Sequence, residues 1–445
     1  MPKITHRKKR LSSFKLIVLG FAGVIVLGAL ILMLPFSSTA GVVTPFHEAL
    51  FTSTSAVCVT GLVVQDTGSY WSAFGQTVIL LLIQIGGLGV VTVAALFAML
   101  SGRKISLMQR STMQDAISAP KVGGIVRLTR FIVRGTFLIE LIGMIVMLPT
   151  FCGNYGIKGI WMAAFHSVSA FCNAGFDILG TAENKYPSLT GYIGNPAINI
   201  TIMLLIIVGG IGFLTWDDIY TNKWHFKKYR MQSKVILVTT AILIIAPAVF
   251  FFFCDFTGLP LAERILASLF QSVTPRTAGF NTADLSAMTG SSKAIMTLLM
   301  LVGGSPGSTA GGMKTTTLAV LIMSAFSVCR KKDDAEVCGR RIDGSAVKNA
   351  AAVAVMYFLL FFVGGIVIST AEGLPLSTRL YETASAVGTV GLTLGITPQL
   401  GVLSQLILIV LMYLGRVGGL TLIYAAVSNK NHSGAKLPLE KITVG

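Results

Sequence analysis

Charged residues are scarce in this chain. Only 12% of its 445 residues are Asp, Glu, Lys or Arg, and the mean hydropathy is +0.77. Because soluble domains carry roughly 25% charged residues, this composition excludes an ordinary soluble globular protein. Histidine is rarer still, with five residues, and none has a matching acid or nucleophile nearby at membrane depth. The sequence therefore offers no credible set of catalytic residues for an enzyme.

Cysteine is also sparse and shows no pattern of a metal site. The six residues form no CxxC pair and have no companion histidine spacing. We interpret them as packing residues rather than as metal ligands or disulfide partners. They are Cys58, Cys152, Cys172, Cys254, Cys329 and Cys338.

The chain has long apolar runs instead. Runs of about 20 residues, the length that crosses about 30 Å of hydrocarbon, predict an all-α integral membrane protein with eight spanning helices. The first run, 14–36, is too long for a signal-peptide core, and we keep it as a span. The eight runs begin near Phe14, Gly75, Thr136, Pro196, Val235, Ala294, Ala351 and Leu403.

The net charge of +17 is unevenly distributed. Five segments hold 27 of the 35 Lys and Arg residues and carry a net charge of +19, whereas the opposite loops carry −4. This is the positive-inside bias, so we expect both termini to be cytoplasmic and the basic runs to set topology rather than bind nucleic acid. The five segments are 1–15, 103–134, 217–234, 330–348 and 430–441.

A short glycine step recurs four times, with spacings of 114, 104 and 112 residues between successive glycines. The steps are Thr60-Gly61-Leu62, Ala174-Gly175-Phe176, Ala278-Gly279-Phe280 and Val390-Gly391-Leu392. A long apolar helix with its own glycine cluster follows each step. Regular self-similarity of this kind predicts a tandem fourfold repeat of helix, pore loop and helix around a central pore, as in potassium channels.

The repeat divides the chain into six parts. We predict a basic cytoplasmic N-terminus at 1–13, repeats at 14–102, 103–222, 223–332 and 333–428, and a cytoplasmic tail at 429–445.

The segments before the four glycines are only 10–12 residues long, too short to span a membrane. Turn signals such as Pro45, Pro260 and Pro375 flank them, so we predict half-helices that enter from outside. The negative end of each helix dipole then favours a cation at the centre. The third segment needs a one-residue gap, because Phe270 lies nine rather than ten residues before its glycine.

Backbone carbonyls beside these glycines are the candidate ligands for a monovalent cation, K⁺. Aiming carbonyls at an axis often needs positive φ, which glycine adopts easily. Each loop has one such glycine, and only the fourth, starting at Gly388, approaches a two-glycine TVGYG filter, so we expect looser selectivity for K⁺ over Na⁺. The predicted filter residues are Val59, Thr60, Gly61, Asn173, Ala174, Gly175, Thr277, Ala278, Gly279, Thr389, Val390 and Gly391.

The second helix of each repeat carries a glycine pair, which we interpret as helix packing in three repeats. The pairs are Gly86-Gly87, Gly209-Gly210, Gly303-Gly304 and Gly418-Gly419. In the third repeat the pair opens a polar stretch that no continuous helix tolerates, and we predict a mobile gate beneath the filter. A phosphate-binding loop is excluded, because Met313 stands where its lysine belongs. The predicted gate comprises Gly303, Gly304, Ser305, Pro306, Gly307, Ser308, Thr309, Ala310, Gly311, Gly312, Lys314 and Arg416.

Charged residues inside the spans need partners. For Arg416 we prefer a role against the gate, and a purely structural clamp is the alternative. We expect Arg276 to tie its loop to a neighbouring acid and Glu140 to make a helix–helix hydrogen bond rather than relay protons. Asp217 and Asp218 are interpreted as solvated residues at a helix end.

The residues at 167–176, 274–282, 303–314 and 415–419 closely resemble the Trk/Ktr/HKT superfamily of potassium transporters. The likeness covers about 14–428 and is greatest to KtrB, the type of membrane subunit found in bacterial Ktr potassium-uptake systems. The short N-terminus lacks the additional helices of TrkH-type members.

This resemblance implies a homodimer in a bacterial cell membrane, each protomer with its own pore, and potassium uptake that depends on sodium as activator, a symport. It also implies a cytosolic ring of RCK-type subunits (KtrA) that binds ATP or ADP, because this chain has no nucleotide motif of its own. The contact surface we expect is Arg330–Arg341 and Lys223–Lys234.

Three functions remain in competition. The first is a gated, channel-like uptake pathway driven by membrane potential. The second is a coupled secondary transporter, since broken helices also build transporter sites. Four equivalent loops and a single intramembrane acid, Glu140, disfavour it. The third, an intramembrane enzyme, lacks catalytic residues.

Overall fold

The computed structural model describes residues 12–101, 105–117, 123–332, 334–373, 375–419 and 421. Within these ranges the chain forms sixteen α-helices, five one-turn 3₁₀ helices and one two-stranded sheet. The predicted tail, 429–445, and most of the predicted basic N-terminus lie outside the described residues. The 3₁₀ helices are Pro35–Ser37, Thr190–Tyr192, Phe226–Lys228, Leu285–Ala287 and Thr397–Gln399.

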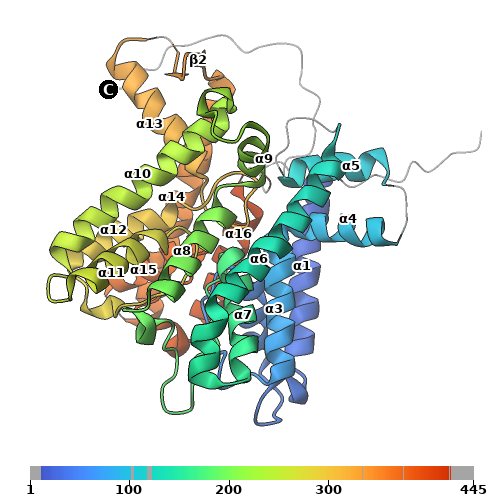
Figure 1. The fold of residues 1–445 in the computed structure, drawn as a ribbon, viewed down its shortest axis with the longest axis vertical. Helices are drawn as coiled ribbons and strands as arrows, with labels where there is room; N and C mark the ends of the chain where they lie inside the picture. Colours follow the sequence, from blue (N-terminus) through green and yellow to red (C-terminus); the bar gives the residue numbers. More distant parts are fainter. Residues whose placement is uncertain are drawn as a thin grey trace, which may run out of the picture.

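Four long helices each open one repeat and run along the long axis of the molecule (Figure 1). They are α1 (Ser13–Leu32), α6 (Ile125–Tyr155), α10 (Met231–Cys254) and α14 (Gly344–Glu372). Each is long and apolar enough to cross a bilayer. Their outward faces remain apolar, with Leu27 60% and Ile145 58% exposed. Lipid covers such a surface at no hydrophobic cost.

A short helix precedes each of the four recurring glycines, as predicted. These pore helices are α2 (Phe46–Val57), α7 (Lys158–Phe171), α11 (Leu261–Val273) and α15 (Leu376–Gly388), and they are 12–14 residues long. Pro45, Pro260 and Pro375 directly precede three of them. Proline lacks an N–H group, and the start of a helix is where that group has no helical partner.

The second helix of each repeat is bent, interrupted or short. α3 (Ala73–Leu88) and α4 (Val90–Leu100) meet at 96°, and α8 (Pro196–Gly210) and α9 (Phe213–Asn222) at 99°. In the third repeat α12 (Gly290–Leu301) and α13 (Thr315–Cys329) are separated by the predicted interruption. α16 (Val402–Val417) belongs to the fourth. By length and composition, four described helices are able to cross a bilayer, or six elements if each bent pair counts as one span, against the eight predicted; the second helices of the third and fourth repeats are shorter.

Glycine causes both the bends and the close packing. Gly89, Gly212 and Gly418 all have φ between 85° and 91°, a conformation that ends a helix and that residues with a side chain rarely adopt. Another glycine precedes each of these by three residues: Gly86, Gly209 and Gly415. A Cβ atom at any of the three would overlap a carbonyl oxygen in the last turn of the pore helix of the same repeat.

The predicted glycine pair of the fourth repeat is thereby wrong. The residues equivalent to Gly86-Gly87 and Gly209-Gly210 are Gly415-Arg416, because Gly415 makes the close approach and Gly418 makes the bend. Arg416 thus occupies the position that Gly87 and Gly210 hold in the first two repeats.

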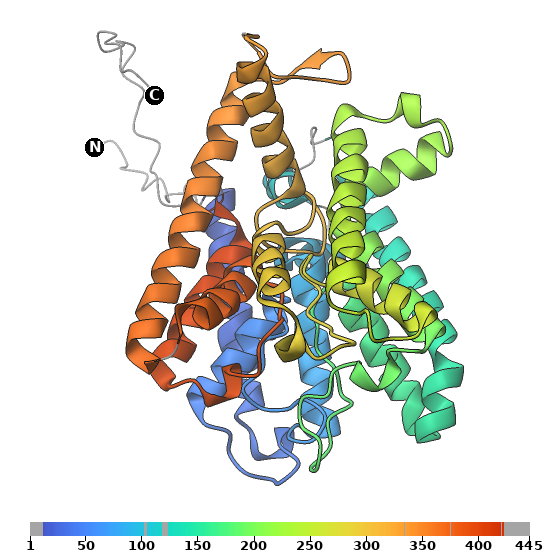
Figure 2. The ribbon, with the colours of Figure 1, turned by 90° about the vertical axis from the view of Figure 1, so that its left-hand side faces the viewer.

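The repeats close into a ring. The second helix of each repeat packs on the pore helix of the next: α3 on α7, α8 on α11, α12 on α15, and α16 on α2. Figure 2 shows the orange and red helices of the fourth repeat beside the blue helices of the first. Residues at opposite ends of the sequence are therefore neighbours around one centre.

The described parts of three basic segments, 103–134, 217–234 and 330–348, lie at one end of the molecule, which we call the basic end (top of Figure 1). It holds α5 (Leu107–Ile117), α9 and a hairpin of β1 (Glu336–Val337) and β2 (Arg340–Arg341). The loops that follow the filter glycines lie at the opposite, loop end.

Asp218 is not a solvated helix-end residue, contrary to expectation. It is 3% exposed and accepts hydrogen bonds from the Arg230 amide and the Ser233 hydroxyl. The carboxylate caps the start of α10, where backbone N–H groups have no helical partner. Asp217 is partly exposed and pairs with Arg230 at 2.7 Å.

Packing does not explain all six cysteines. Cys58 and Cys172 are buried, but Cys254, Cys329 and Cys338 are exposed, so the packing interpretation is wrong for these three.

Candidate functional site

The four recurring glycines contact one another in a closed circuit. A Cβ atom on Gly61 would lie no more than 2.5 Å from the Ala174 carbonyl oxygen, and one on Gly175 would lie equally close to that of Ala278. A Cβ atom on Gly279 would lie equally close to the Val390 carbonyl oxygen, and one on Gly391 would lie at least as close to that of Thr60. Backbone meets backbone at every step, so no side chain fits at these positions. The twelve predicted filter residues are thus brought together in one ring.

The backbone of each loop alternates in handedness. φ is positive at each ring glycine and again two residues earlier, at Val59 (52°), Asn173 (58°), Thr277 (68°) and Thr389 (52°), but not at the residue between. Successive carbonyls of an ordinary strand point to opposite sides, and this alternation turns them toward the same side. Four such loops can surround a cation with carbonyl oxygens.

One detail of the filter prediction is corrected, and one feature was not predicted. Besides its ring glycine, each filter strand has another residue with positive φ, which is not a glycine. Gly388 ends α15 without positive φ, so the fourth loop is no closer to a two-glycine filter than the others. Each left-handed residue with a side chain costs about 1–3 kcal/mol and persists only where its surroundings enforce it.

Hydroxyl groups in the pore helices supply that support. Ser55 and Ser385 accept hydrogen bonds from the amides of Gly61 and Gly391 at 3.1 and 3.0 Å. Ser169 and Thr274 donate to the carbonyls just after the other two glycines, at 2.7 and 2.5 Å.

These hydroxyl residues stand six residues before three of the glycines and five before Gly279. The predicted one-residue gap of the third loop therefore lies between Thr274 and Gly279. Sequence reasoning noted the hydroxyl-rich segments but gave them no role. Their fixed spacing from the glycines was the available signal.

The interruption between α12 and α13 reaches the base of the filter. Gly303 N donates to Met313 O at 2.8 Å, which closes the segment into a loop. A Cβ on Gly311 would overlap the Thr389 side chain, and one on Gly312 would lie 2.8 Å from Gly388 O. The segment therefore touches the first residue of the fourth filter strand, at the side facing the basic end.

The same segment is held by the second repeat. Ser305 N and Thr309 N donate to Gly210 O and Gly209 O at 2.9 and 3.2 Å, and Phe213 N donates to Gly307 O at 2.7 Å. These contacts satisfy backbone groups that would otherwise be unpaired at membrane depth.

Arg416 links this segment to the first repeat. Its guanidinium donates to Thr309 O and to Gly86 O, with a further contact to Gly87 O at 3.3 Å. Lys314 donates within the segment, to Ala310 O at 2.9 Å. Carbonyl oxygens are the partners a membrane arginine needs when no carboxylate is near. The Arg416 side chain thus contacts the interrupting segment and also bridges it to the first repeat.

A cavity of about 260 Å³ lies on the basic-end side of this segment. Its lining includes Pro306 to Ser308, Lys314, Arg416 and Asp115 of α5. A solute that passed the filter and the segment would enter this space.

Other charged residues are placed differently from expectation. Glu140 receives a hydrogen bond from Gln84 of α3 at 3.4 Å, the expected helix–helix contact. Arg276 was expected to meet an acid, but its guanidinium donates to Thr240 at 3.2 Å, and the ion pairs found among the described residues do not include it.

Glu382 of α15 was missed by sequence reasoning, so Glu140 is not the only buried acid. Glu382 is fully buried and accepts hydrogen bonds from the hydroxyls of Thr393 and Thr397 at 2.5 and 2.8 Å and from Leu394 N at 3.1 Å. It holds the strand that follows the fourth filter glycine.

Sequence comparison identifies the family of this fold. Residues 24–433 match the TrkH family, described as a cation transport protein. The chain belongs to the TrkH family. It is therefore a cation transporter and not an enzyme, and a multi-pass cell-membrane protein.

Two similar curated proteins match almost throughout. The potassium/sodium uptake protein NtpJ of Enterococcus hirae is 39% identical, covering 98% of both chains. The Ktr system potassium uptake protein B of Bacillus subtilis is 38% identical, covering 92% of both. Among solved structures, the potassium transporter TrkH from Vibrio parahaemolyticus superposes with a TM-score of 0.74 at 18% identity, covering 96% of this chain and 87% of that one. This last match supports the fold.

The ring predicts a sharp difference between two nearby glycines. Gly391 and Gly395 have similar φ values of 93° and 85°, but only Gly391 faces a neighbouring loop. Gly391→Ala should strain the ring and reduce the preference for K⁺ over Na⁺ at least several-fold, measured as competition against rubidium uptake. Gly395→Ala carries the same backbone strain without the clash and should leave the preference unchanged. Equal effects of the two substitutions would show that the ring contact does not set selectivity.

Proposed function

We propose that this chain carries potassium ions into the cell through a selective, gated, channel-like pore. The observation that carries the proposal is the closed ring of four loops, whose alternating φ turns carbonyl oxygens toward one axis. Rings of backbone carbonyls replace the hydration shell of K⁺ in selective pores. The potassium-uptake names of two proteins 38–39% identical to this chain support the choice of ion.

The direction of the pore follows from charge. Basic residues gather at the end that carries α5, α9 and the β1–β2 hairpin, so this end is cytoplasmic by the positive-inside bias. The loop end then faces outward, and both termini are cytoplasmic. In that orientation the pore helices point their C-termini at the ring and favour a cation there.

The segment 303–314, with Arg416, is the proposed gate. It lies between the ring and the cavity toward the basic end, and glycine, serine and threonine supply six of its first eight residues after Val302. A displacement of this segment would open a continuous path, and several of the contacts that hold it are hydrogen bonds that can break and re-form as the segment moves.

The proposal also covers the assembly of the protein and its regulation. The resemblance to Ktr systems supports a homodimer, activation by Na⁺, and a cytosolic RCK-type ring (KtrA) that binds ATP or ADP. The exposed bases of the β1–β2 hairpin and of residues 223–234 are the surface proposed for that partner. One similar protein carries a potassium/sodium name, which supports a role for sodium.

Transport by the purified chain in liposomes tests the proposal. With K⁺ inside the vesicles and a valinomycin-free bilayer, external rubidium should enter down its electrical gradient, and external K⁺ should block this uptake better than Na⁺. Sodium, the proposed activator, is therefore present at equal concentration on both sides. Uptake that still occurs only when a proton or sodium gradient is imposed would contradict a channel-like pathway and favour a coupled transporter.

The gate makes a separate prediction. Arg416→Gln removes contacts to Thr309 O and Gly86 O, so the segment should be displaced more often and rubidium flux should rise several-fold. Arg110→Gln removes an exposed charge from α5 at the basic end and should leave flux unchanged. Deletion of residues 305–310 should also raise flux. Folded variants of both kinds with wild-type flux would show that the segment is a structural link only.

A further inference from the structure

The second residue after each ring glycine (position two) lies on the side of the ring that faces the loop end, which we call the mouth of the filter. The residues there are Val63, Asp177, Asn281 and Thr393, and all four are partly exposed. The residues just before them, at position one, are all buried. Because the four glycines contact each other in a circuit, the residues at position two follow the same circuit one step farther out. A cation passes them immediately before it reaches the ring.

Only two of the four offer an oxygen atom that is not already used. Thr393 donates its hydroxyl to Glu382, and Val63 is apolar. Asn281 uses its amide nitrogen on Ala283 O at 3.1 Å, which leaves its side-chain oxygen available. The Asp177 carboxylate accepts a hydrogen bond from Leu179 N at 3.2 Å, and no side-chain donor to it is found among the described residues. These two residues belong to adjacent loops, because Gly175 contacts Gly279 and Ala278.

Asp177 is the charged member of this rim and has no basic partner. It is absent from the ion pairs found in the described part of the chain. Burial raises the pKa of its carboxyl to about 7; the Leu179 amide opposes this shift and the negative charge of Asp66 adds to it. A carboxylate beside a like charge is stabilised by a cation that comes close.

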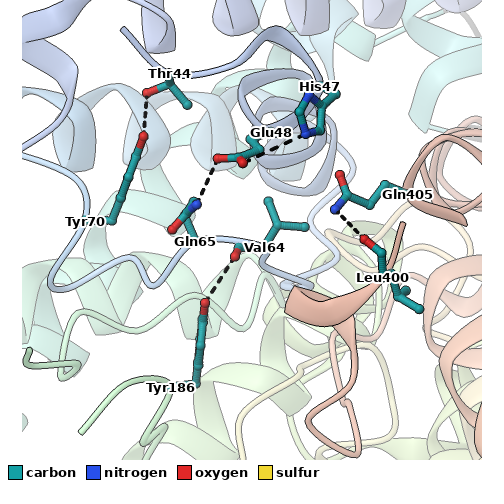
Figure 3. Close-up of polar contacts among 9 residues, drawn as sticks. All are labelled: Thr44, His47, Glu48, Val64, Gln65, Tyr70, Tyr186, Leu400 and Gln405. Atoms are coloured by element: carbon teal, nitrogen blue, oxygen red, sulfur yellow. Dashed lines mark hydrogen bonds and ion pairs between the residues drawn. The ribbon is translucent and has the colours of Figure 1, made fainter. Parts of the chain in front are cut away.

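The residues around Asp66 hydrogen-bond to one another. None of these contacts among the described residues brings a basic side chain to Asp177. Asp66 accepts bonds from Ser69 and from Tyr186 N at 3.0 Å. Figure 3 shows adjacent contacts: the Gln65 amide donates to Glu48 at 2.9 Å, and the Tyr186 hydroxyl donates to Val64 O at 3.1 Å. His47 lies 3.9 Å from Glu48 and is the one base in this view.

We propose that Asp177 and Asn281 form an outer site for a partly hydrated monovalent cation, which feeds the carbonyl ring. This inference rests on the proposed function, since it assigns the step before the filter. Carboxylate groups at a pore mouth raise the local concentration of cations and their rate of entry. The site acts on how readily ions arrive, whereas the ring decides which ion passes.

The test measures rubidium uptake into liposomes against external rubidium concentration. Asp177→Asn should raise the half-saturating concentration about three- to tenfold and leave the maximal rate and the K⁺ over Na⁺ preference unchanged. Asn281→Asp should lower the half-saturating concentration, because it adds a second carboxylate. The double variant D177N/N281D returns one carboxylate to the rim and should restore a value near that of the wild type.

The matched control is Glu183→Gln. Glu183 is an exposed acid in the same loop, six residues farther along, so the substitution changes the charge equally without touching the mouth. An unchanged half-saturating concentration in D177N, or an equal change in E183Q, would overturn the outer site. A loss of K⁺ preference in D177N would also overturn it, because Asp177 would then belong to the filter.

External pH gives an independent readout. Protonation of Asp177 below about pH 7 neutralises it, so the half-saturating concentration of the wild type should rise between pH 8 and pH 6. Since the nearby loop-end contacts include the titratable groups His47, Glu48, Asp66 and Tyr186, the difference between wild type and D177N isolates the part due to Asp177. Identical pH profiles would contradict the proposal. Failure of the wild type itself to carry rubidium would instead contradict the proposed function.

Discussion

Four loops of this protein meet backbone to backbone around one centre. At Gly61, Gly175, Gly279 and Gly391 the neighbouring carbonyl leaves no room for a Cβ atom, so four separate stretches of the sequence must meet without side chains. The rest of the fold serves this approach. Pore helices bring each loop to the centre, hydroxyls from Ser55 and Ser385 hold the glycine amides, and each second helix packs on the next pore helix. The left-handed backbone of Thr389 and its equivalents is strained in isolation and is retained because these contacts enforce it.

The fourfold pattern is broken at two neighbouring places. Gly87 and Gly210 have Arg416 as their counterpart in the fourth repeat, and the third repeat replaces a helical turn with a polar loop. The arginine reaches Thr309 O of that loop and Gly86 O of the first repeat. A charge at membrane depth is costly unless polar groups surround it, and the loop supplies them. Each irregular element therefore stabilises the other, which explains why they occur together in the same layer below the ring.

Sequence periodicity was sufficient for the repeats, the pore helices and the interruption, because each depends on local signals such as proline, apolar length and glycine spacing. It was insufficient where a residue's role depends on a contact across repeats. Gly415 and Gly418 could not be told apart until Gly415 was seen against Val387. Asp218 was assigned to solvent because its partners Arg230 and Ser233 lie beyond a turn. Glu382 was overlooked because a glutamate in a short helix carries no pattern of its own.

Locating the ion itself tests the account most directly. Crystals grown with rubidium in place of potassium would show its position by anomalous scattering. The account predicts peaks on the central axis of the ring, between the backbone oxygens of residues such as Thr60 and Gly61 and their three equivalents. Rubidium bound only elsewhere, with no peak inside the ring under conditions in which rubidium is transported, would contradict the claim that these four loops form the path of the ion.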